Sequence, residues 1–180
     1  MCGIVGAISE RKVSRILLEG LKRLEYRGYD SAGIALLSEK RARLQLLRTV
    51  GKVRRLSDAV LTRKLQGNTG IAHTRWATHG KPSIRNAHPH LSQNEIAIVH
   101  NGIIENFESL RHRMTNKGYE FKTETDSEVI AHLIHQEKKN GKVSFLNSVM
   151  RALGKLKGAY GICAIDNTNR DQIVVARSGS

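Results

Sequence analysis

The first eight residues of the chain place a cysteine directly behind the initiator methionine and follow it with small and apolar side chains. Residues 3–8, Gly-Ile-Val-Gly-Ala-Ile, are typical of a buried strand. A strand at this point would hold the thiol of Cys2 in a fixed place. We therefore expect the rest of the chain to be organised around this N-terminal segment.

Removal of Met1 would give Cys2 two reactive groups on one Cα, a thiol and a free α-amine. The thiol is a nucleophile in its thiolate form. An α-amine has a pKa of roughly 7.7–8.0, so it can accept and return a proton near neutral pH. One residue could then supply both nucleophile and base. Many chains begin with Met-Cys, so these two residues alone make Cys2 no more than a candidate catalytic residue.

Hydrophobic periodicity divides the remainder into helices and strands. Apolar residues recur at helical spacing over residues 12–26, 53–61, 107–114, 129–134 and 143–153. Thr125 and Glu128 have the spacing of a capping box, so the fourth of these helices should begin there. We expect strands over residues 33–37, 44–47, 70–76, 95–100, 119–123, 159–165 and 172–176, and a polar loop over 78–90. Hairpins mixed with paired helices favour an α+β fold in which helices cover sheets.

The composition fits a globular protein in a reducing compartment. The 180 residues, 39% of them hydrophobic and 26% charged, allow one domain or two small ones. No apolar run is long enough to span a bilayer, and no charged-then-apolar leader opens the chain. Cys2 and Cys163 are the only cysteines and make no disulfide framework. We expect a cytoplasmic location and no membrane association.

The chain is strongly basic, with 30 Lys and Arg against 16 Asp and Glu and a net charge of +14. Such a charge can indicate anionic partners such as nucleic acid. Many of the basic residues, Lys12, Arg15 and Lys22 among them, interleave with an apolar helical stripe, and aromatic residues make up only 4% of the chain. Stacking platforms for bases are therefore scarce, and we favour solvated helix faces over nucleic-acid recognition.

Three segments carry polar groups at or beyond the end of an expected element. Residues 75–80, Arg-Trp-Ala-Thr-His-Gly, gather a guanidinium, an indole, a hydroxyl and an imidazole, and arginine is suited to bidentate capture of a carboxylate. Asn101-Gly102 offers a side-chain amide and an unhindered backbone N–H, the make-up of an oxyanion hole, although the pair is commoner as a plain turn. We expect the strand over 95–100 to end at this pair. Asp126 could bind an ammonium group or could simply begin a helix.

Eight histidines raise the question of a metal site, with His88-Pro89-His90 near His79. Zinc sites need a further close ligand and usually regular spacing, and Pro89 fixes an extended loop between the two imidazoles. We therefore expect neither a metal nor another cofactor. Cys163 lies among apolar residues of an expected strand, where a buried and inert thiol is the favoured interpretation.

Five segments together resemble a known family. They are residues 1–6 (Met-Cys-Gly-Ile-Val-Gly), 26–33 (Tyr-Arg-Gly-Tyr-Asp-Ser-Ala-Gly), 73–80 (His-Thr-Arg-Trp-Ala-Thr-His-Gly), 100–106 (His-Asn-Gly-Ile-Ile-Glu-Asn) and 124–128 (Glu-Thr-Asp-Ser-Glu). In this order they resemble the glutaminase domain of the glutamine–fructose-6-phosphate aminotransferase family, a branch of the class II glutamine amidotransferases. The first segment alone would suit any member of the class, while the second and third select this branch.

The resemblance implies an N-terminal-nucleophile fold, a four-layer αββα sandwich. It also implies that Cys2 is the nucleophile and that Asn101 and the Gly102 N–H form the oxyanion hole. Arg75, helped by Thr78 and His79, would hold the α-carboxylate of L-glutamine, and Asp126 its α-ammonium. Trp76 would lie in the loop that closes over the substrate.

The resemblance further implies partners for the longer members of the family. These carry two sugar-phosphate isomerase domains that bind fructose 6-phosphate, and a homodimer is expected for the full-length enzyme. The present 180 residues hold no counterpart of those domains, and we expect the glutaminase domain itself to be cut short at Ser180. Two alternatives stay open at this point, a glutaminase domain of another class II amidotransferase and an inactive basic binding module that keeps the fold.

Overall fold

The computed structural model describes residues 2–38, 43–76, 80–141 and 143–179. Within them the chain forms two four-stranded antiparallel sheets with helices on their outer faces. The first sheet has the strand order β1-β4-β2-β3 and the second the order β5-β6-β7-β8. The sequence-based expectation of an α+β fold is confirmed.

The N-terminal half builds the first sheet and its helical layer. Its strands are β1 (Gly3–Ile8), β2 (Ser31–Leu37), β3 (Leu44–Val50) and β4 (Thr69–Arg75). Its helices are α1 (Ser14–Leu24), a short 3-10 turn η1 (Glu25–Arg27) and α2 (Val53–Thr62). The apolar faces of α1 and α2 pack on one face of this sheet, with Leu17, Leu21 and Leu56 fully buried among Ile34, Leu36 and Ala72.

The C-terminal half repeats the arrangement. Its strands are β5 (His90–Ser92), β6 (Ile96–Ile104), β7 (Gly158–Asp166) and β8 (Asn169–Ser178). Helices α3 (Phe107–Thr115), α4 (Glu128–Gly141) and α5 (Phe145–Leu153) cover its outer face. Ile130, Leu133 and Val149 of this layer pack against Ile98 and Ile162 of the sheet.

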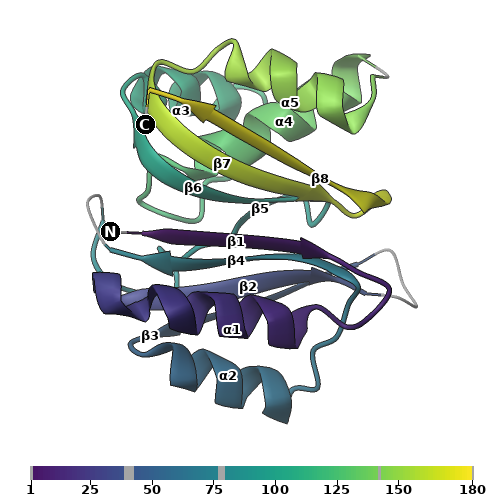
Figure 1. Ribbon diagram of the computed structural model, residues 1–180. Coiled ribbons are helices and arrows are strands. Elements are labelled where there is room, and N and C mark those ends of the chain that lie inside the picture. The colour runs from purple at the N-terminus through teal and green to yellow at the C-terminus, as the bar shows by residue number, and fades with distance from the viewer. Residues whose placement is uncertain (1, 39–42, 77–79, 142, 180) are drawn as a thin grey trace.

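The two sheets lie face to face, so the molecule has four layers in the order helix, sheet, sheet, helix (Figure 1). A third apolar cluster fills the space between the sheets and includes Leu37, Ile71, Val99 and Cys163. This is the αββα sandwich that the family resemblance implies. Among the described residues, no helix combines the length and the apolar character that a bilayer crossing needs.

Residues 119–123, all of which the structure describes, form no strand, so that expectation is wrong. The backbone N–H groups of Lys122 and Thr123 donate to the carboxylate of Glu128, at 3.0 and 2.8 Å, instead of to a neighbouring strand. The predicted capping box of Thr125 and Glu128 does not form. The Glu128 carboxylate binds this upstream segment, the N–H of Thr125 donates to Oγ1 of Thr123 at 3.4 Å, and helix α4 begins at Glu128.

The expected end of a strand at Asn101-Gly102 is also wrong, because β6 continues to Ile104 and pairs with β7 as far as Gly158. Gly102 has φ of +126°, and a Cβ placed on it would lie 2.0 Å from the carbonyl oxygen of Ala159. The glycine therefore permits close strand approach where the sequence suggested a turn. The short strand β5, beginning at His90, falls at the end of the expected loop.

Candidate active site

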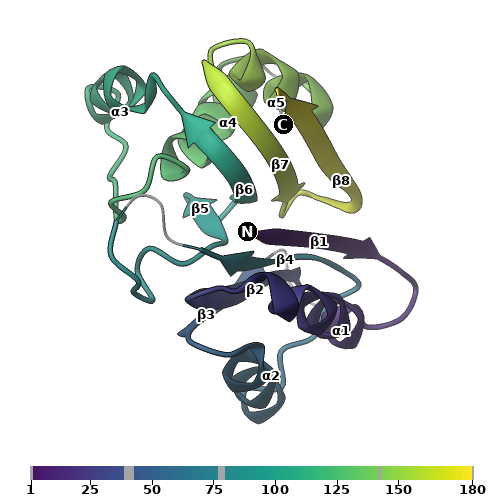
Figure 2. The same cartoon turned by 60° about the vertical axis from the view of Figure 1, so that its left-hand side comes forward.

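Strand alternation places three polar side chains between the two sheets. On β4, Ile71 faces the space between the sheets while Ala72 faces the helices, so His73 and Arg75 share the face of Ile71. On β6 the same alternation puts Asn101 on the face of Val99. On β1 it puts Cys2 on the face of Ile4. The segments that bear these residues meet at one end of the sandwich, near the label N in Figure 2.

Cys2 lies just before β1 and is partly exposed. Its Sγ accepts a hydrogen bond from the backbone N–H of Trp76 at 3.2 Å, and it lies 3.6 Å from the carbonyl oxygen of the same residue. The next residue is fixed as well, because the N–H of Gly3 donates to Oγ1 of Thr74 at 3.1 Å. The ladder between β1 and β4 therefore holds the thiol at a defined point above the end of β4.

Both the nitrogen and the oxygen of the Asn101 side-chain amide make hydrogen bonds. Its Nδ2 donates to the carbonyl oxygen of Cys2 at 3.2 Å, and its Oδ1 lies 2.8 Å from Nε2 of His73. Gly102 follows directly on the same strand. An amide nitrogen and a backbone N–H thus come from consecutive residues beside the thiol.

Arg75 ends β4 and is buried, with 4% of its surface exposed. One guanidinium nitrogen lies 3.9 Å from the carboxylate of Asp30, and the other donates to the carbonyl oxygen of Gly80 at 3.4 Å. Trp76 follows and is 54% exposed. Its indole lies against Gly28, where an added Cβ would lie 2.6 Å from the ring, so glycine allows the ring to approach this backbone closely.

Asp126 lies in the loop before α4 and is also buried. Its Oδ2 accepts a hydrogen bond from the N–H of Ile104 at 2.8 Å, and Ser127 donates to its Oδ1 at 3.3 Å. Ser127 in turn lies 2.8 Å from Nδ1 of His100. These bonds tie the carboxylate to the end of β6, next to Asn101 and Gly102.

One cavity of about 790 Å³ joins these groups. Six of the eight residues named as site residues in the sequence line it, namely Cys2, Arg75, Trp76, Asn101, Gly102 and Asp126. Thr78 and His79, the other two, lie outside the described residues. The structure adds lining residues that sequence reasoning did not assign, which are Arg27, His88, His100, Ile103, Thr125, Ser127, Gly161 and Arg177. Five of them belong to the segments that carry the family resemblance, which was the available signal for them, namely Arg27, His100, Ile103, Thr125 and Ser127.

A cluster of buried histidines, His73, His88 and His90, lies beside this cavity, and His88 is the member that lines it. The rings of His73 and His88 lie 4.3 Å apart, as do those of His88 and His90. Burial lowers the pKa of His73 to about 4 and that of His90 to about 3, so both are neutral at neutral pH. Within the described ranges, no group of three or more His, Cys, Asp or Glu side chains is arranged to hold a metal ion.

Cys163 is buried between the sheets, where Gly6 of β1 packs against its sulfur. Burial raises the pKa of its thiol to about 12. At neutral pH this cysteine is therefore protonated and unreactive.

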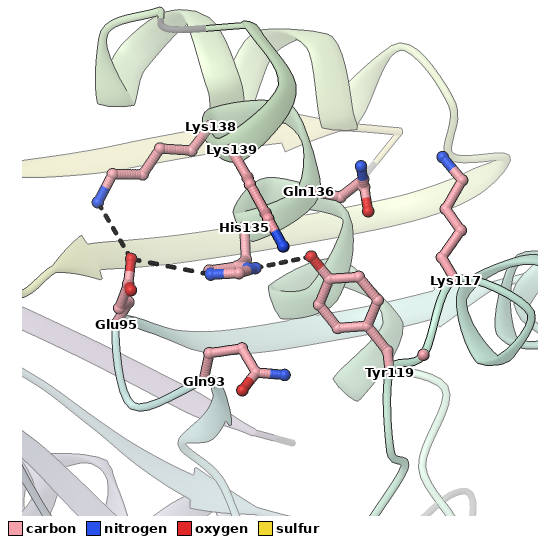
Figure 3. Close-up of a pocket in the computed structure, with 9 residues that line it drawn as sticks. Gln93, Glu95, Lys117, Tyr119, His135, Gln136, Lys138 and Lys139 are labelled. Carbon is pink, nitrogen blue, oxygen red and sulfur yellow. Dashed lines mark hydrogen bonds and ion pairs between the residues drawn. The ribbon is translucent and has the colours of Figure 1, made fainter.

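A second cavity, of about 630 Å³, lies between the β5–β6 turn, the end of α3 and the last turns of α4 (Figure 3). Its charged groups largely bind one another, because His135 and Lys138 both lie within 4 Å of Glu95 and Lys138 also binds Asp166 at 2.8 Å. Lys117 and Lys139 lie at the C-terminal ends of α3 and α4, where cations are favoured by the helix dipole. This cavity contains no cysteine or serine and shares no lining residue with the first.

The fold and the arrangement around Cys2 define the class of protein. A family model described as "Glutamine amidotransferase domain" matches residues 73–179, and the chain belongs to this family. Over all 180 residues it is 56% identical to a glutamine–fructose-6-phosphate aminotransferase of Shewanella oneidensis and 55% identical to one of Legionella pneumophila strain Paris. The chain spans 29% and 30% of the lengths of these curated relatives.

Two solved structures share the fold of this chain. A glutamine phosphoribosylpyrophosphate amidotransferase from B. subtilis matches with a TM-score of 0.76 and 29% identity, covering 98% of this chain and 36% of that one. A structure described as the allosteric regulatory enzyme of purine biosynthesis matches with a TM-score of 0.77 and 30% identity, covering 98% of this chain and 37% of that one.

Proposed function

We propose that this chain hydrolyses L-glutamine to glutamate and ammonia at Cys2, as the ammonia-donating part of a glutamine–fructose-6-phosphate aminotransferase. The observation that carries the proposal is the single cavity in which a thiol, a buried guanidinium and a buried carboxylate meet. The identity of 55–56% with enzymes of that name, against 29% with the phosphoribosylpyrophosphate amidotransferase, supports this branch over the other class II enzymes.

The two buried charges fit the two ends of an amino acid. Arg75, with Thr78 and His79, would bind the α-carboxylate, since a guanidinium can donate two parallel hydrogen bonds to it. Asp126, whose carboxylate is already oriented by Ile104 and Ser127, would bind the α-ammonium. The side-chain amide of the substrate then extends toward Cys2. Trp76, which is exposed above the cavity, would cover the bound molecule.

The first half of the reaction forms a thioester. The thiol proton passes to the free α-amine of Cys2 as the sulfur attacks the side-chain amide carbon, and the carbonyl electron pair moves onto oxygen. Asn101 Nδ2 and the Gly102 N–H donate to this oxyanion. When the carbonyl re-forms, the C–N bond breaks, the protonated α-amine gives its proton to the leaving nitrogen, and ammonia departs.

The second half regenerates the thiol. The α-amine takes a proton from a water molecule while the oxygen of that water attacks the thioester carbon. The C–S bond then breaks, the proton returns to the sulfur, and glutamate leaves. This chemistry requires that Met1 be absent, because an amide nitrogen on Cys2 would not act as a base.

In the longer enzyme we propose that the ammonia is used on fructose 6-phosphate, bound by isomerase domains beyond these 180 residues. A cytoplasmic location suits the two free thiols. A homodimer is the assembly we propose for the full-length enzyme.

Glutamate release from glutamine, measured on protein whose N-terminal mass is known, tests the proposal. Cys2→Ala should abolish the reaction with an unchanged circular dichroism spectrum, while Cys163→Ala should leave it nearly unchanged because that thiol is buried and protonated. Equal loss in the two variants would refute the assignment of Cys2. A wild-type chain with a free Cys2 amine that releases no glutamate would instead favour the inactive binding module.

A further inference from the structure

We propose that His73 is a positioning residue that fixes the orientation of the Asn101 amide, so that its N–H and not its carbonyl faces the reacting carbonyl oxygen. This inference rests on the proposed glutamine hydrolysis and extends it to a buried residue that touches neither the thiol nor the substrate. In this proposal His73 acts on the reaction through Asn101.

The amide of an asparagine can turn by half a rotation and exchange its oxygen and nitrogen. In this structure two contacts decide between the orientations. The carbonyl oxygen of Cys2 can only accept, so the amide group 3.2 Å from it must be Nδ2. Oδ1 then faces His73, 2.8 Å from Nε2.

This arrangement also decides where the His73 ring carries its proton. An amide oxygen only accepts, so Nε2 must be the protonated nitrogen. Burial keeps the ring neutral at neutral pH, because it lowers the pKa to about 4. The ring is fully buried and lies against the ring of His88, 4.3 Å away, so it has little freedom to turn aside.

The orientation matters because Asn101 lines the cavity beside Cys2. Nδ2 carries two N–H groups, one of which donates to the carbonyl oxygen of Cys2 and the other of which is left for the oxyanion. A turned amide would present Oδ1 to a developing negative charge and would repel it. Loss of one oxyanion donor lowers kcat by about 10²–10³-fold in other enzymes.

Two matched substitutions separate the hydrogen bond from the ring. The side-chain nitrogen of a glutamine reaches about as far as Nε2 of histidine, while that of an asparagine reaches only the Nδ1 position. His73→Gln should therefore keep kcat near the wild-type value. His73→Asn should lower kcat by about 10²-fold with KM little changed, because the loss appears only when the oxyanion forms.

Three controls show whether His73 acts through Asn101. In an Asn101→Ala background, His73→Asn should have no further effect. Alkylation of Cys2 by iodoacetamide should keep its rate in every His73 variant, because the thiol is untouched. His132→Asn changes an equally buried histidine, bonded to Ser92 at 2.9 Å and outside this cavity, and should leave kcat unchanged.

A measurement on the unmodified protein keeps the proposal testable if a variant fails to fold. The ¹⁵N chemical shifts of the His73 ring should report the Nε2–H form at neutral pH, and an Nδ1–H form would overturn the proposal. Four results with the variants would also overturn it. They are full kcat in His73→Asn, equal losses of kcat in His73→Gln and His73→Asn, a further loss from His73→Asn in the Asn101→Ala background, and slower alkylation of Cys2. A wild-type chain that releases no glutamate refutes the proposed function before His73 is changed.

Discussion

Arg75 and Asp126 carry opposite charges in one cavity, and the protein orients both of them without substrate. The guanidinium is held near Asp30 and Gly80, and the carboxylate accepts the N–H of Ile104. Buried charges are costly unless they are paired and hydrogen-bonded. Hydrogen-bonded or charged neighbours therefore hold both groups in place, at the two positions where the proposed site binds the ends of an amino acid.

Arg75→Lys should weaken glutamine binding although the charge is kept. An ammonium acts as a point charge and cannot make the paired hydrogen bonds of a guanidinium. A hydrogen bond to a charged group contributes about 1.5–3 kcal/mol, so KM should rise by about tenfold or more. Steady-state kinetics measure this, with Arg23→Lys on the exposed face of α1 as the control. Asp126→Asn should raise KM as well, and a KM that neither site variant moves would contradict the proposed substrate orientation.

At the scale of elements, Asn86 connects two segments that border the site. Its Nδ2 donates to the carbonyl oxygen of Lys81 at 3.0 Å and to the carboxylate of Glu124 at 2.9 Å, and its Oδ1 accepts the N–H of Glu124 at 3.0 Å. In the sequence, residue 81 comes five positions after Trp76, and residue 124 lies two positions before Asp126. One buried side-chain amide therefore connects residue 81 to the segment that leads to Asp126.

Asn86→Ala should lower the free energy of unfolding by about 1 kcal/mol, because it removes the hydrogen bonds of a buried side chain to residues 81 and 124. It should also raise KM, since the segment before Asp126 loses its attachment to residue 81. Asn116→Ala, which removes an exposed amide bonded to His112, serves as the control. Urea unfolding and kinetics on the two variants test this, and equal stability of both would show that the Asn86 bonds do not hold the segments together.

The elements that the sequence predicted correctly include α1 and α5, whose apolar residues recur at helical spacing. They also include β7, a continuous apolar run in which Ile162 and Cys163 pack on opposite faces of the sheet. The wrong predictions occur where a contact of one particular residue, and not a periodic pattern, determines the backbone conformation. Residues 119–123 alternate well enough for a strand, but the carboxylate of Glu128 takes their N–H groups. Gly102 suggests a turn, yet it serves a close strand contact that only the three-dimensional pairing reveals.

The residues of the site could be predicted from the sequence, but the contacts that hold them in place could not. Cys2, Arg75, Asn101 and Asp126 belong to motifs that name the family, so the sequence identified them before their cavity was known. The contact between His73 and Asn101 joins β4 to β6, which lie in different sheets, and no local pattern reports it. Alternation along residues 71–75 was the one available signal, because it puts His73 on the same face as Arg75.

At the scale of the whole molecule, neutral histidines buried between the layers make stability depend on pH. Burial lowers the pKa of His73 to about 4, that of His90 to about 3 and that of His88 well below its ordinary value. In the unfolded chain each has a pKa of roughly 6.5. Below that pH the unfolded state binds more protons than the folded state, so stability is lost as the pH falls.

We therefore expect the urea midpoint to fall steadily from pH 6.5 to pH 4. Each such histidine contributes up to about 1.4 kcal/mol per pH unit. Glu128 adds a loss of the same sign from about pH 4.5 downward. Although burial raises its pKa, contacts with His132, Lys122 and Thr123 outweigh burial and lower that pKa to about 2. His90→Gln should flatten the slope, while a midpoint that stays constant from pH 6.5 to pH 4.5 would refute the linkage to buried histidines.

The covalent intermediate on Cys2 is the most direct test of the proposed mechanism. Protein freed of Met1 is mixed with glutamine, quenched in acid within the first turnover, digested and measured by mass spectrometry. The account predicts a γ-glutamyl group on the peptide that begins with Cys2, none on the peptide that contains Cys163, and its disappearance when glutamine is exhausted. Glutamate release without any adduct on Cys2 under these conditions, or an adduct on Cys163, would contradict it.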